Sequence, residues 1–306
     1  MDLKWQDVQN RLVLGSKDYK CICESIRSMA DYLEKDYKFE VYLGDGSKVN
    51  IKDNFSLEKK MKVFLEQTKV NYLNELKRLG RINAGDFEGY FNNITDRDEQ
   101  KKLLNYLKLR AWQISKGYFL ETLCLLAVLK KFRPAASKTN DFLLFKKIGP
   151  IPISDKGKLI FLWYQPTVKI SKSGMPAKPD IVLTNTDKDV SKETITSIIE
   201  CKCRENISAS DLRNEFGKAF DLEVNSYLIV TYYSVSQSLI EAAKRLGIEL
   251  IDFGLYSAER EKYLQRETML EEVLSNKIVK SYEESSFSQN LSKIAAIAKE
   301  KILQIS

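Results

Sequence analysis

Short hydrophobic runs alternate with amphipathic stretches over the second half of the chain. The runs are rich in Ile, Leu, Val and aromatic residues and are bounded by polar segments, which is typical of strands. Strands are expected at 159–164, 180–184, 195–203, 227–232 and 248–253. Helical spacing predicts one helix at 208–222, opened by a Ser208-x-x-Asp211 capping box, and another at 236–246.

A wholly apolar segment, 118–129, lies inside a further expected helix at 115–132. Because apolar residues occupy every side of it, this helix should be buried. The order from residue 115 is therefore helix, three strands, helix, strand, helix, strand. That order predicts an α/β fold, with a mixed central sheet flanked by helices.

Before residue 115 the pattern is mainly helical. Apolar positions recur at helical spacing over 18–35 and 57–79, and another helix is expected over 98–112. Between the first two helices, strands at 39–43 and 48–51 flank a glycine turn and predict a β-hairpin. The chain therefore divides into a mainly helical N-terminal region, an α/β core and a helical C-terminal extension, at 1–114, 115–256 and 257–306.

Composition narrows the class of protein. Hydrophobic residues make up 43% and charged residues 30%, which is a globular balance. No basic start followed by an apolar stretch is visible at the N-terminus, and the longest apolar run, which contains Glu121, is too short to span a bilayer. We therefore expect a cytoplasmic protein with no membrane partner. The 5 cysteines, two pairs of them spaced Cys-x-Cys, fit neither a disulfide framework nor a structural zinc site.

The absence of histidine excludes several kinds of chemistry. A chain with 0 His residues has no imidazole to serve as a base, nucleophile or metal ligand. Ser-His-Asp hydrolases, His-metal nucleases and His-zinc deaminases are thereby ruled out. Catalysis here must depend on carboxylates, lysines, hydroxyls or thiols.

The excess positive charge is concentrated in one stretch. The net charge of the whole chain is +7, whereas residues 115–180 alone hold 12 Lys and Arg against 4 Asp and Glu. A local basic surface is typical of proteins that bind polyanions such as nucleic acid. A solvated, lysine-rich face is the alternative interpretation of the same charge.

Two carboxylates and a lysine converge on neighbouring expected strands. Glu200 and Lys202 lie two residues apart, so their side chains share one face of a strand, and Asp180 opens the strand before it. Two carboxylates brought together repel each other unless a divalent cation lies between them, and oxygen ligands suit Mg²⁺. Lys202 would orient or deprotonate the attacking water and balance charge, as metal-assisted phosphodiester hydrolysis requires. Taken singly, Asp180 after Pro179 is more often a turn or cap residue, and Glu200 with Lys202 is more often a cross-strand ion pair on a solvated face.

Pro179-Asp180 followed by Glu200-Cys201-Lys202 resembles the motif of the PD-(D/E)XK nucleases, a restriction-endonuclease-like superfamily. The resemblance covers roughly residues 115–253, including the order of helices and strands. It implies that Asp180, Glu200 and the backbone carbonyl of Cys201 bind Mg²⁺, with Mn²⁺ able to substitute, and that Lys202 is the catalytic lysine.

The resemblance also suggests further site residues. Many members carry an acidic residue on the helix before the first core strand, and Glu121 stands at that position as a catalytic residue and metal ligand. A carboxylate inside an apolar helix is costly unless something pairs with it, which agrees with this role; a place at the helix end, facing water or an ion pair, is the alternative. Some members have a polar residue on the helix after the lysine, for which Glu215 and Lys218 are candidates.

The loop before Asp180 belongs to the basic stretch and could bind the DNA backbone. Its phosphate-binding candidates are Lys169, Lys172, Ser173 and Lys178. An exposed, flexible connection is the alternative interpretation of this loop.

The resemblance implies a Mg²⁺-dependent endonuclease acting on double-stranded DNA, and a type II restriction endonuclease is the leading hypothesis. A homodimer is expected because cutting both strands calls for two active sites, and region 1–114 would serve DNA recognition or dimerisation. Alternatives are a structure-specific or modification-dependent nuclease, such as a Holliday-junction resolvase, an Mrr-like enzyme or a transposition nuclease. Cleavage of RNA and a catalytically silent nucleic-acid-binding module also stay open.

Overall fold

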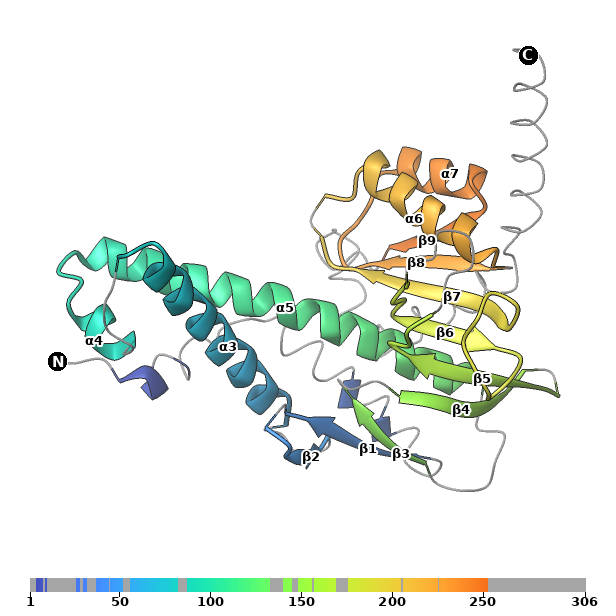
Figure 1. Ribbon diagram of the computed structural model, residues 1–306, viewed down its shortest axis with the longest axis horizontal. Helices are drawn as coiled ribbons and strands as arrows, with labels where there is room; N and C mark the ends of the chain where they lie inside the picture. The colour runs from blue at the N-terminus through green and yellow to red at the C-terminus, as the bar shows by residue number, and fades with distance from the viewer. Residues whose placement is uncertain are drawn as a thin grey trace, which may run out of the picture.

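A six-stranded mixed sheet forms the centre of the second half of the chain (Figure 1). Its first four strands run antiparallel to their neighbours, and the last two add in parallel to the fourth. In spatial order they are β4 (Ile148–Asp155), β5 (Lys158–Tyr164), β6 (Ile181–Thr184), β7 (Ile195–Lys202), β8 (Tyr227–Thr231) and β9 (Ile248–Asp252). This arrangement confirms the expected α/β class with a mixed sheet.

The structure is a computed structural model, and part of the chain is described in it. The described residues are 4–7, 9, 26–27, 30–31, 37–43, 45–51, 56–81, 87–132, 140–144, 148–155, 157–168, 176–204, 206–224 and 226–252. The expected helix at 18–35 lies largely outside them, and the expected helical extension at 257–306 lies wholly outside. Across the described ranges, no helix combines the length and the apolar character needed to cross a membrane.

Helices cover both faces of the six-stranded sheet, as the sequence predicts. α5 (Arg97–Phe132) packs against one face, where Ile199 of β7 points, and α6 (Ala209–Leu222) and α7 (Gln237–Arg245) pack against the other, where Ile198 points. Neighbouring residues of β7 therefore belong to two different cores. Side-chain alternation along this strand decides which helix each site residue meets.

The expected capping box opens α6. The Ser208 side chain accepts from the Asp211 backbone N–H, and the Asp211 carboxylate accepts from the Ser208 N–H at 2.9 Å. Such a cap stabilises a helix by about 1 kcal/mol. It fixes where α6 begins, and hence which of its residues face β7.

α5 is one helix of 36 residues, whereas two helices at 98–112 and 115–132 were expected. The prediction of a break was wrong because no proline lies inside the segment, and Ala111 and Lys116, on either side of it, are both buried. The boundary placed between residues 114 and 115 therefore falls inside a helix. α5 extends from the N-terminal region to the central sheet (Figure 1).

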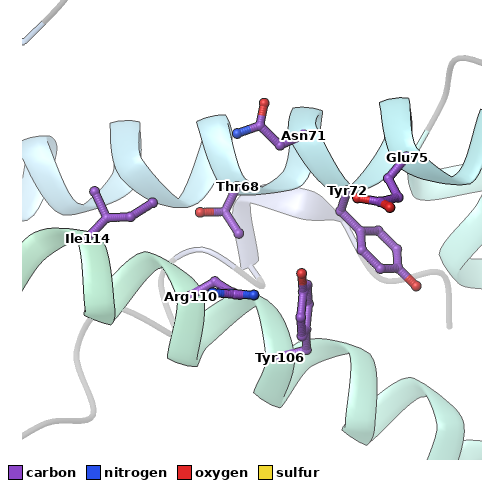
Figure 2. A pocket seen from close by; sticks show the side chains of 7 residues that line it. All are labelled: Thr68, Asn71, Tyr72, Glu75, Tyr106, Arg110 and Ile114. Atoms are coloured by element: carbon purple, nitrogen blue, oxygen red, sulfur yellow. The ribbon is translucent and has the colours of Figure 1, made fainter. Parts of the chain in front are cut away.

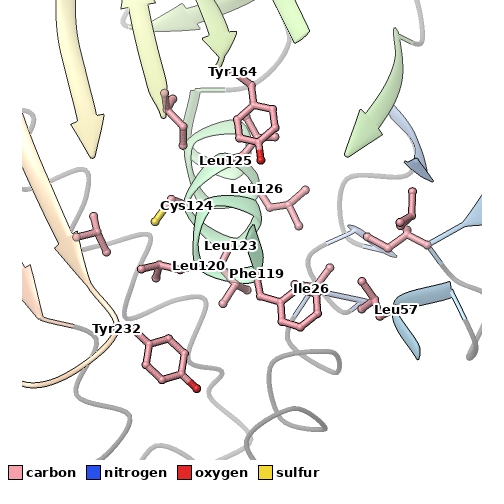
Figure 3. Packing of buried hydrophobic residues seen from close by; sticks show 14 of the residues in the cluster. Ile26, Leu57, Phe119, Leu120, Leu123, Cys124, Leu125, Leu126, Tyr164 and Tyr232 are labelled. Atoms are coloured by element: carbon pink, nitrogen blue, oxygen red, sulfur yellow. The ribbon is translucent and has the colours of Figure 1, made fainter. Parts of the chain in front are cut away.

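The apolar half of α5 is buried on all sides, as expected. Figure 3 shows Phe119 directed toward Ile26 and Leu57 of the N-terminal region, while Leu125 lies near Tyr164 of the central sheet. The helix is apolar all round because it lies between these two sets of elements. The N-terminal region thus shares its core with the central sheet.

A β-hairpin, a long helix and a short helix precede α5 in the described part of the N-terminal region. The expected hairpin is confirmed as β1 (Tyr37–Tyr42) paired with β2 (Lys48–Asn50), and the expected helix at 57–79 as α3 (Ser56–Arg78). β1 also pairs in parallel with β3 (Asn140–Leu144), which the sequence pattern did not predict. The short helix α4 (Phe87–Asn92) precedes α5.

Candidate active site

The register between β6 and β7 brings Asp180 to Glu200. Ile181 is paired with Ile199, so extending the antiparallel register by one residue sets Asp180 opposite Glu200 on the same face. The ladder itself stops there, and the Asp180 side chain takes its place by accepting from the Cys201 backbone N–H at 2.7 Å. Two carboxylates from neighbouring strands are thereby held side by side at the end of β6.

Glu200 and Lys202 face α6, where they meet two charged residues of that helix. Lys202 Nζ lies 3.0 Å from Glu200 Oε2 and 2.8 Å from Glu215 Oε1. Lys218 Nζ lies 3.1 Å from Glu200 Oε1 and 3.0 Å from Glu215 Oε2. The four side chains form a closed ring of alternating charges, which we call the charge ring. The Tyr227 hydroxyl donates to Glu215 at 2.6 Å and adds a neutral contact to it.

Burial and ion pairing within the charge ring shift the pKa values of Lys202 and Glu215. Burial alone lowers the pKa of Lys202, but Glu200 and Glu215 outweigh it, so that the pKa is raised above its ordinary value. Burial likewise disfavours the charged form of Glu215, but Lys202, with Tyr227 and Lys218, makes the net shift of its pKa a lowering. Lys202 is therefore held as an ammonium. This favours orienting water and balancing charge over accepting a proton.

Glu121 approaches the same place from α5, on the other face of the sheet. Its Oε2 atom accepts from the Tyr164 hydroxyl at 2.8 Å and from Gln165 Nε2 at 2.7 Å. Gln165 also donates its backbone N–H to the Asp180 carbonyl at 2.7 Å, with φ at 48° in the left-handed region. Glu121 lies in the interior of a long helix, so the alternative position at a helix end is wrong. Gln165 connects Glu121 to the segment that carries Asp180.

The electrostatics of the three acids favour a cation among them. Burial raises the pKa of Asp180 well above its ordinary value, and the charges of Glu121 and Glu200 raise it further. Burial also raises the pKa of Glu121, against the hydrogen bonds from Tyr164 and Gln165. The ionised forms of these carboxylates thus repel one another, and a divalent cation bound among them would relieve this repulsion.

The oxygen atoms present fit a magnesium site of ordinary composition. Within the described part of the chain, no three Asp, Glu or Cys side chains are grouped so that they alone could hold a metal ion. Mg²⁺ usually takes one or two carboxylates and completes its shell with water and phosphate oxygens. Asp180 and Glu200 supply two carboxylates of that kind, and Glu121 lies near enough to act on both electrostatically.

The backbone of Cys201 has the orientation that a third ligand requires. Ile198 and Lys202 turn their backbone groups toward the β8 side, where Ile198 N–H donates to Ser226 and Lys202 C=O accepts from Tyr232, both at 2.9 Å. By the alternation of a strand, Cys201 turns its N–H and C=O toward the end of β6 and Asp180. Burial and the neighbouring Cys124 raise the pKa of its thiol well above the ordinary value, which disfavours the thiolate form.

The predicted DNA-binding residues are described only in part. Lys178 lies two residues before Asp180 and is exposed to solvent, so its contact with phosphate stays a prediction. Its neighbour Ala177 bridges to Val168, which ties the segment to the end of β5. Lys169, Lys172 and Ser173 lie outside the described residues.

Several residues of the site carry no signal in the sequence. The partners of Glu121 are Tyr164 and Gln165, and no motif distinguishes these from ordinary strand-end residues. A cavity of about 110 Å³ lies beside Lys202. It is lined by Lys202, Arg204, Ile207, Asp211, Asn214 and Glu215, of which no sequence motif selects Arg204 and Asn214. Glu215 and Lys218 were singled out from the sequence, and the fold brings both to Glu200 and Lys202.

No family model, curated protein or solved structure matches the chain. The resemblance to PD-(D/E)XK nucleases and the restriction-endonuclease-like form of the fold therefore stay predictions.

Proposed function

We propose that this chain is a Mg²⁺-dependent endonuclease that hydrolyses phosphodiester bonds in DNA. The observation that carries the proposal is the register that sets Asp180 opposite Glu200, with Lys202 beside them. A strand end with two facing carboxylates and a held ammonium is suited to a substrate that carries negative charge and to a metal that shares it.

Asp180, Glu200 and the Cys201 carbonyl are the residues that would hold the metal. When bound, Mg²⁺ would supply a Lewis acid that polarises the phosphoryl oxygens and lowers the pKa of bound water. Glu121, anchored by Tyr164 and Gln165, adds negative charge on the α5 side of the site. It would hold and orient water at the position that Asp180 faces.

Lys202 would act on charge rather than on protons. Its ammonium is held between Glu200 and Glu215, and Lys218 shares the same two carboxylates. When Glu200 turns toward a cation, Glu215 keeps Lys202 in place beside the scissile phosphate. The ammonium then balances the charge that develops on the phosphoryl oxygens.

The finer form of the proposal is a type II restriction endonuclease that acts on double-stranded DNA as a homodimer. The N-terminal region shares a core with the central sheet, and α5 connects the two as one continuous helix. Such a region is suited to target recognition or dimerisation. A structure-specific or modification-dependent nuclease would use the same site.

The proposal is tested by incubating the full chain with plasmid DNA and Mg²⁺, with EDTA as the blank. Cleavage is expected with Mg²⁺ alone, and fragments of fixed length would support the restriction form. Lys202→Ala should lower the rate by about 100-fold or more, in the range of groups that act on the transition state. Glu193→Gln, which changes an exposed acid on the β6–β7 loop, is the matched control.

A nucleic-acid-binding module without cleavage is the second candidate. It is favoured by the charge ring, because both lysines already neutralise Glu200 without a cation. DNA binding with no cleavage in either Mg²⁺ or Mn²⁺ would decide for this candidate. If Lys202→Ala cut as fast as the wild type, the assignment of the site would be wrong.

A further inference from the structure

A cavity of about 390 Å³ lies between α3 and α5, away from the carboxylates of the candidate active site. This volume lies within the range of small-molecule sites, roughly 300–1,000 Å³. Figure 2 shows α3 on one side and α5 on the other, with side chains of both directed into the space between them. Its lining residues are Thr68, Asn71, Tyr72, Glu75, Tyr106, Arg110 and Ile114.

Two tyrosines form aromatic walls of this cavity. The ring centroids of Tyr72 and Tyr106 are 5.5 Å apart, and the planes are inclined at 50°. The hydroxyl of Tyr72 is hydrogen-bonded to Tyr90, which anchors the ring, and burial together with this bond raises the pKa of Tyr72 to about 12. Tyr106 is 43% exposed. It therefore offers a stacking face to solvent.

Polar and charged groups surround these walls. The Arg110 guanidinium lies 5.8 Å from the Tyr106 ring centroid, in the geometry of a cation–π contact. Asn71 and Glu75 of α3 line the cavity as well, and they supply donor and acceptor atoms at its rim. A planar ring with polar edges matches this combination, since it can stack on tyrosine and form hydrogen bonds around its perimeter. A nucleobase is such a ring.

The cavity and Glu121 share one face of α5. Arg110 and Glu121 are separated by about three helical turns, so they project in nearly the same direction, about 16 Å apart along the helix. Ile114 of the cavity lies between them on this face. At about 3.4 Å per nucleotide step in a helical strand, that distance corresponds to about five steps.

Gly117 occupies the same face, between Ile114 and Glu121. A Cβ atom added there would meet nothing within 4 Å, so the packing of the described residues does not require glycine. Glycine in a helix interior costs about 1 kcal/mol relative to alanine. The absence of a side chain at Gly117 would let a nucleic-acid strand approach the helix closely between the cavity and Glu121.

We infer that the cavity between α3 and α5 binds an unpaired nucleobase of the nucleic acid whose backbone lies at the candidate active site. The inference rests on the proposed function, because it assumes that the candidate active site binds a nucleic acid. It adds that one base of this substrate is withdrawn from the base stack. The base stacks on Tyr106, and Arg110 binds its edge or the adjoining phosphate. The substrate is then held about five steps from the bond to be cut.

The test measures binding and not cleavage. The full chain is titrated in EDTA with a fluorescently labelled single-stranded oligothymidine, and with an oligonucleotide of equal length that lacks every base. Tyr106→Ala should weaken binding of the oligothymidine by about 5- to 100-fold, the range of one stacked base, and should leave the abasic strand unaffected. Tyr106→Phe, which keeps the ring, should bind as the wild type does.

Leu109→Ala is the matched control, because Leu109 is an exposed residue of α5 that does not line the cavity. Equal weakening of both oligonucleotides by Tyr106→Ala, or equal affinities of Tyr106→Ala and Leu109→Ala, would overturn the inference. The outcome is separate from that of the plasmid assay. If Tyr106→Ala weakened binding only of the strand with bases, and the wild type cut no DNA, the base-binding site would stand and the nuclease would be rejected. If the wild type cut DNA and Tyr106→Ala had no base-dependent effect, the nuclease would stand and the base-binding site would be rejected.

Discussion

The Asp180 carboxylate accepts the backbone N–H of Cys201 at 2.7 Å, at the point where the pairing of β6 with β7 stops. At this position a side-chain carboxylate, and not a backbone carbonyl of the neighbouring strand, accepts the hydrogen bond. Pro179 immediately precedes Asp180 and has no N–H to continue the strand. The same bond that ends β6 therefore fixes the position of a carboxylate opposite Glu200.

Two substitutions at Asp180 separate its charge from its hydrogen bond. Asp180→Asn keeps an oxygen for the Cys201 N–H, whereas Asp180→Ala leaves that donor unpaired. Both variants should lose cleavage, because both lack the metal-binding charge. The free energy of unfolding should be about 1–3 kcal/mol lower for Asp180→Ala than for Asp180→Asn, the cost of an unsatisfied buried donor. Urea denaturation in EDTA measures this difference, and equal values would show that the hydrogen bond contributes nothing.

Without metal, the protein should lose stability as the pH rises. The folded chain keeps a proton on Asp180 and Glu121 at pH values where the unfolded chain has released it, because burial raises both pKa values above the ordinary 3.8 and 4.5. Raising the pH from about these ordinary values through the raised ones therefore favours the unfolded state. Glu200 and Lys202 also act on these acids electrostatically. Glu215 has the opposite effect on stability, because its pKa is lowered overall: Lys202 outweighs the effect of burial.

Comparison with variants isolates that effect. Asp180→Asn and Glu121→Gln should each flatten the fall of unfolding free energy with pH, and Glu193→Gln should not. Saturating Mg²⁺ should raise the thermal midpoint of the wild type at neutral pH, since ligands that bind only the folded state stabilise it. A midpoint that rises by the same amount in Asp180→Asn would contradict a metal site at Asp180.

Glu121 should affect turnover more than binding. Glu121→Gln removes its charge but keeps an acceptor for Tyr164, and Gln165→Ala removes one of the donors that hold it. Outer-shell changes of this kind typically cost about 10- to 100-fold. We expect kcat to fall by this range in both variants, with the KM for DNA nearly unchanged. A fall in DNA affinity with unchanged kcat would identify a structural role only.

Sequence patterning predicted the central sheet because its strands are buried and bounded by clear turns. It missed β4, in which Pro150 and Pro152 argue against a strand; the position of β4 at the edge of the sheet makes both prolines tolerable. Gly149 is required there, since a Cβ atom would lie 2.7 Å from the Trp163 ring. β3 could not be predicted either, because its partner β1 lies about a hundred residues earlier in the sequence.

The site was predictable to the extent that it depends on strand alternation. Glu200 and Lys202 lie two positions apart in the sequence, so their shared face of the strand follows from the sequence alone. The meeting of Glu215 with Lys202 depends instead on how α6 crosses β7, which no local pattern specifies. The contact of Gln165 with Glu121 likewise requires a left-handed residue that sequence preference disfavours.

The charge ring predicts opposite effects for two residues of α6. Glu215 and Lys218 lie on the same face of that helix and pair with each other. Glu215 also pairs with Lys202, and Lys218 pairs with Glu200. Removing Glu215 leaves two ammonium groups on Glu200 and strengthens their competition with a cation. Removing Lys218 frees one Glu200 oxygen. Glu215→Gln should therefore raise, and Lys218→Gln lower, the Mg²⁺ concentration that gives half-maximal cleavage, by about 10-fold each.

Stability should respond in a different pattern from metal dependence. Glu215→Gln breaks two ion pairs of a carboxylate whose side chain is 10% exposed, while its lysine partners are 25% and 33% exposed. Because the lysines retain some water, the loss should be about 1–3 kcal/mol, below the 3–5 kcal/mol of a fully buried pair. The amide still accepts from Tyr227, so the fold is retained and Mg²⁺ can be titrated. If both variants shifted the Mg²⁺ requirement in the same direction, lysine and cation would not be competing for Glu200, and the role given to the charge ring would be wrong.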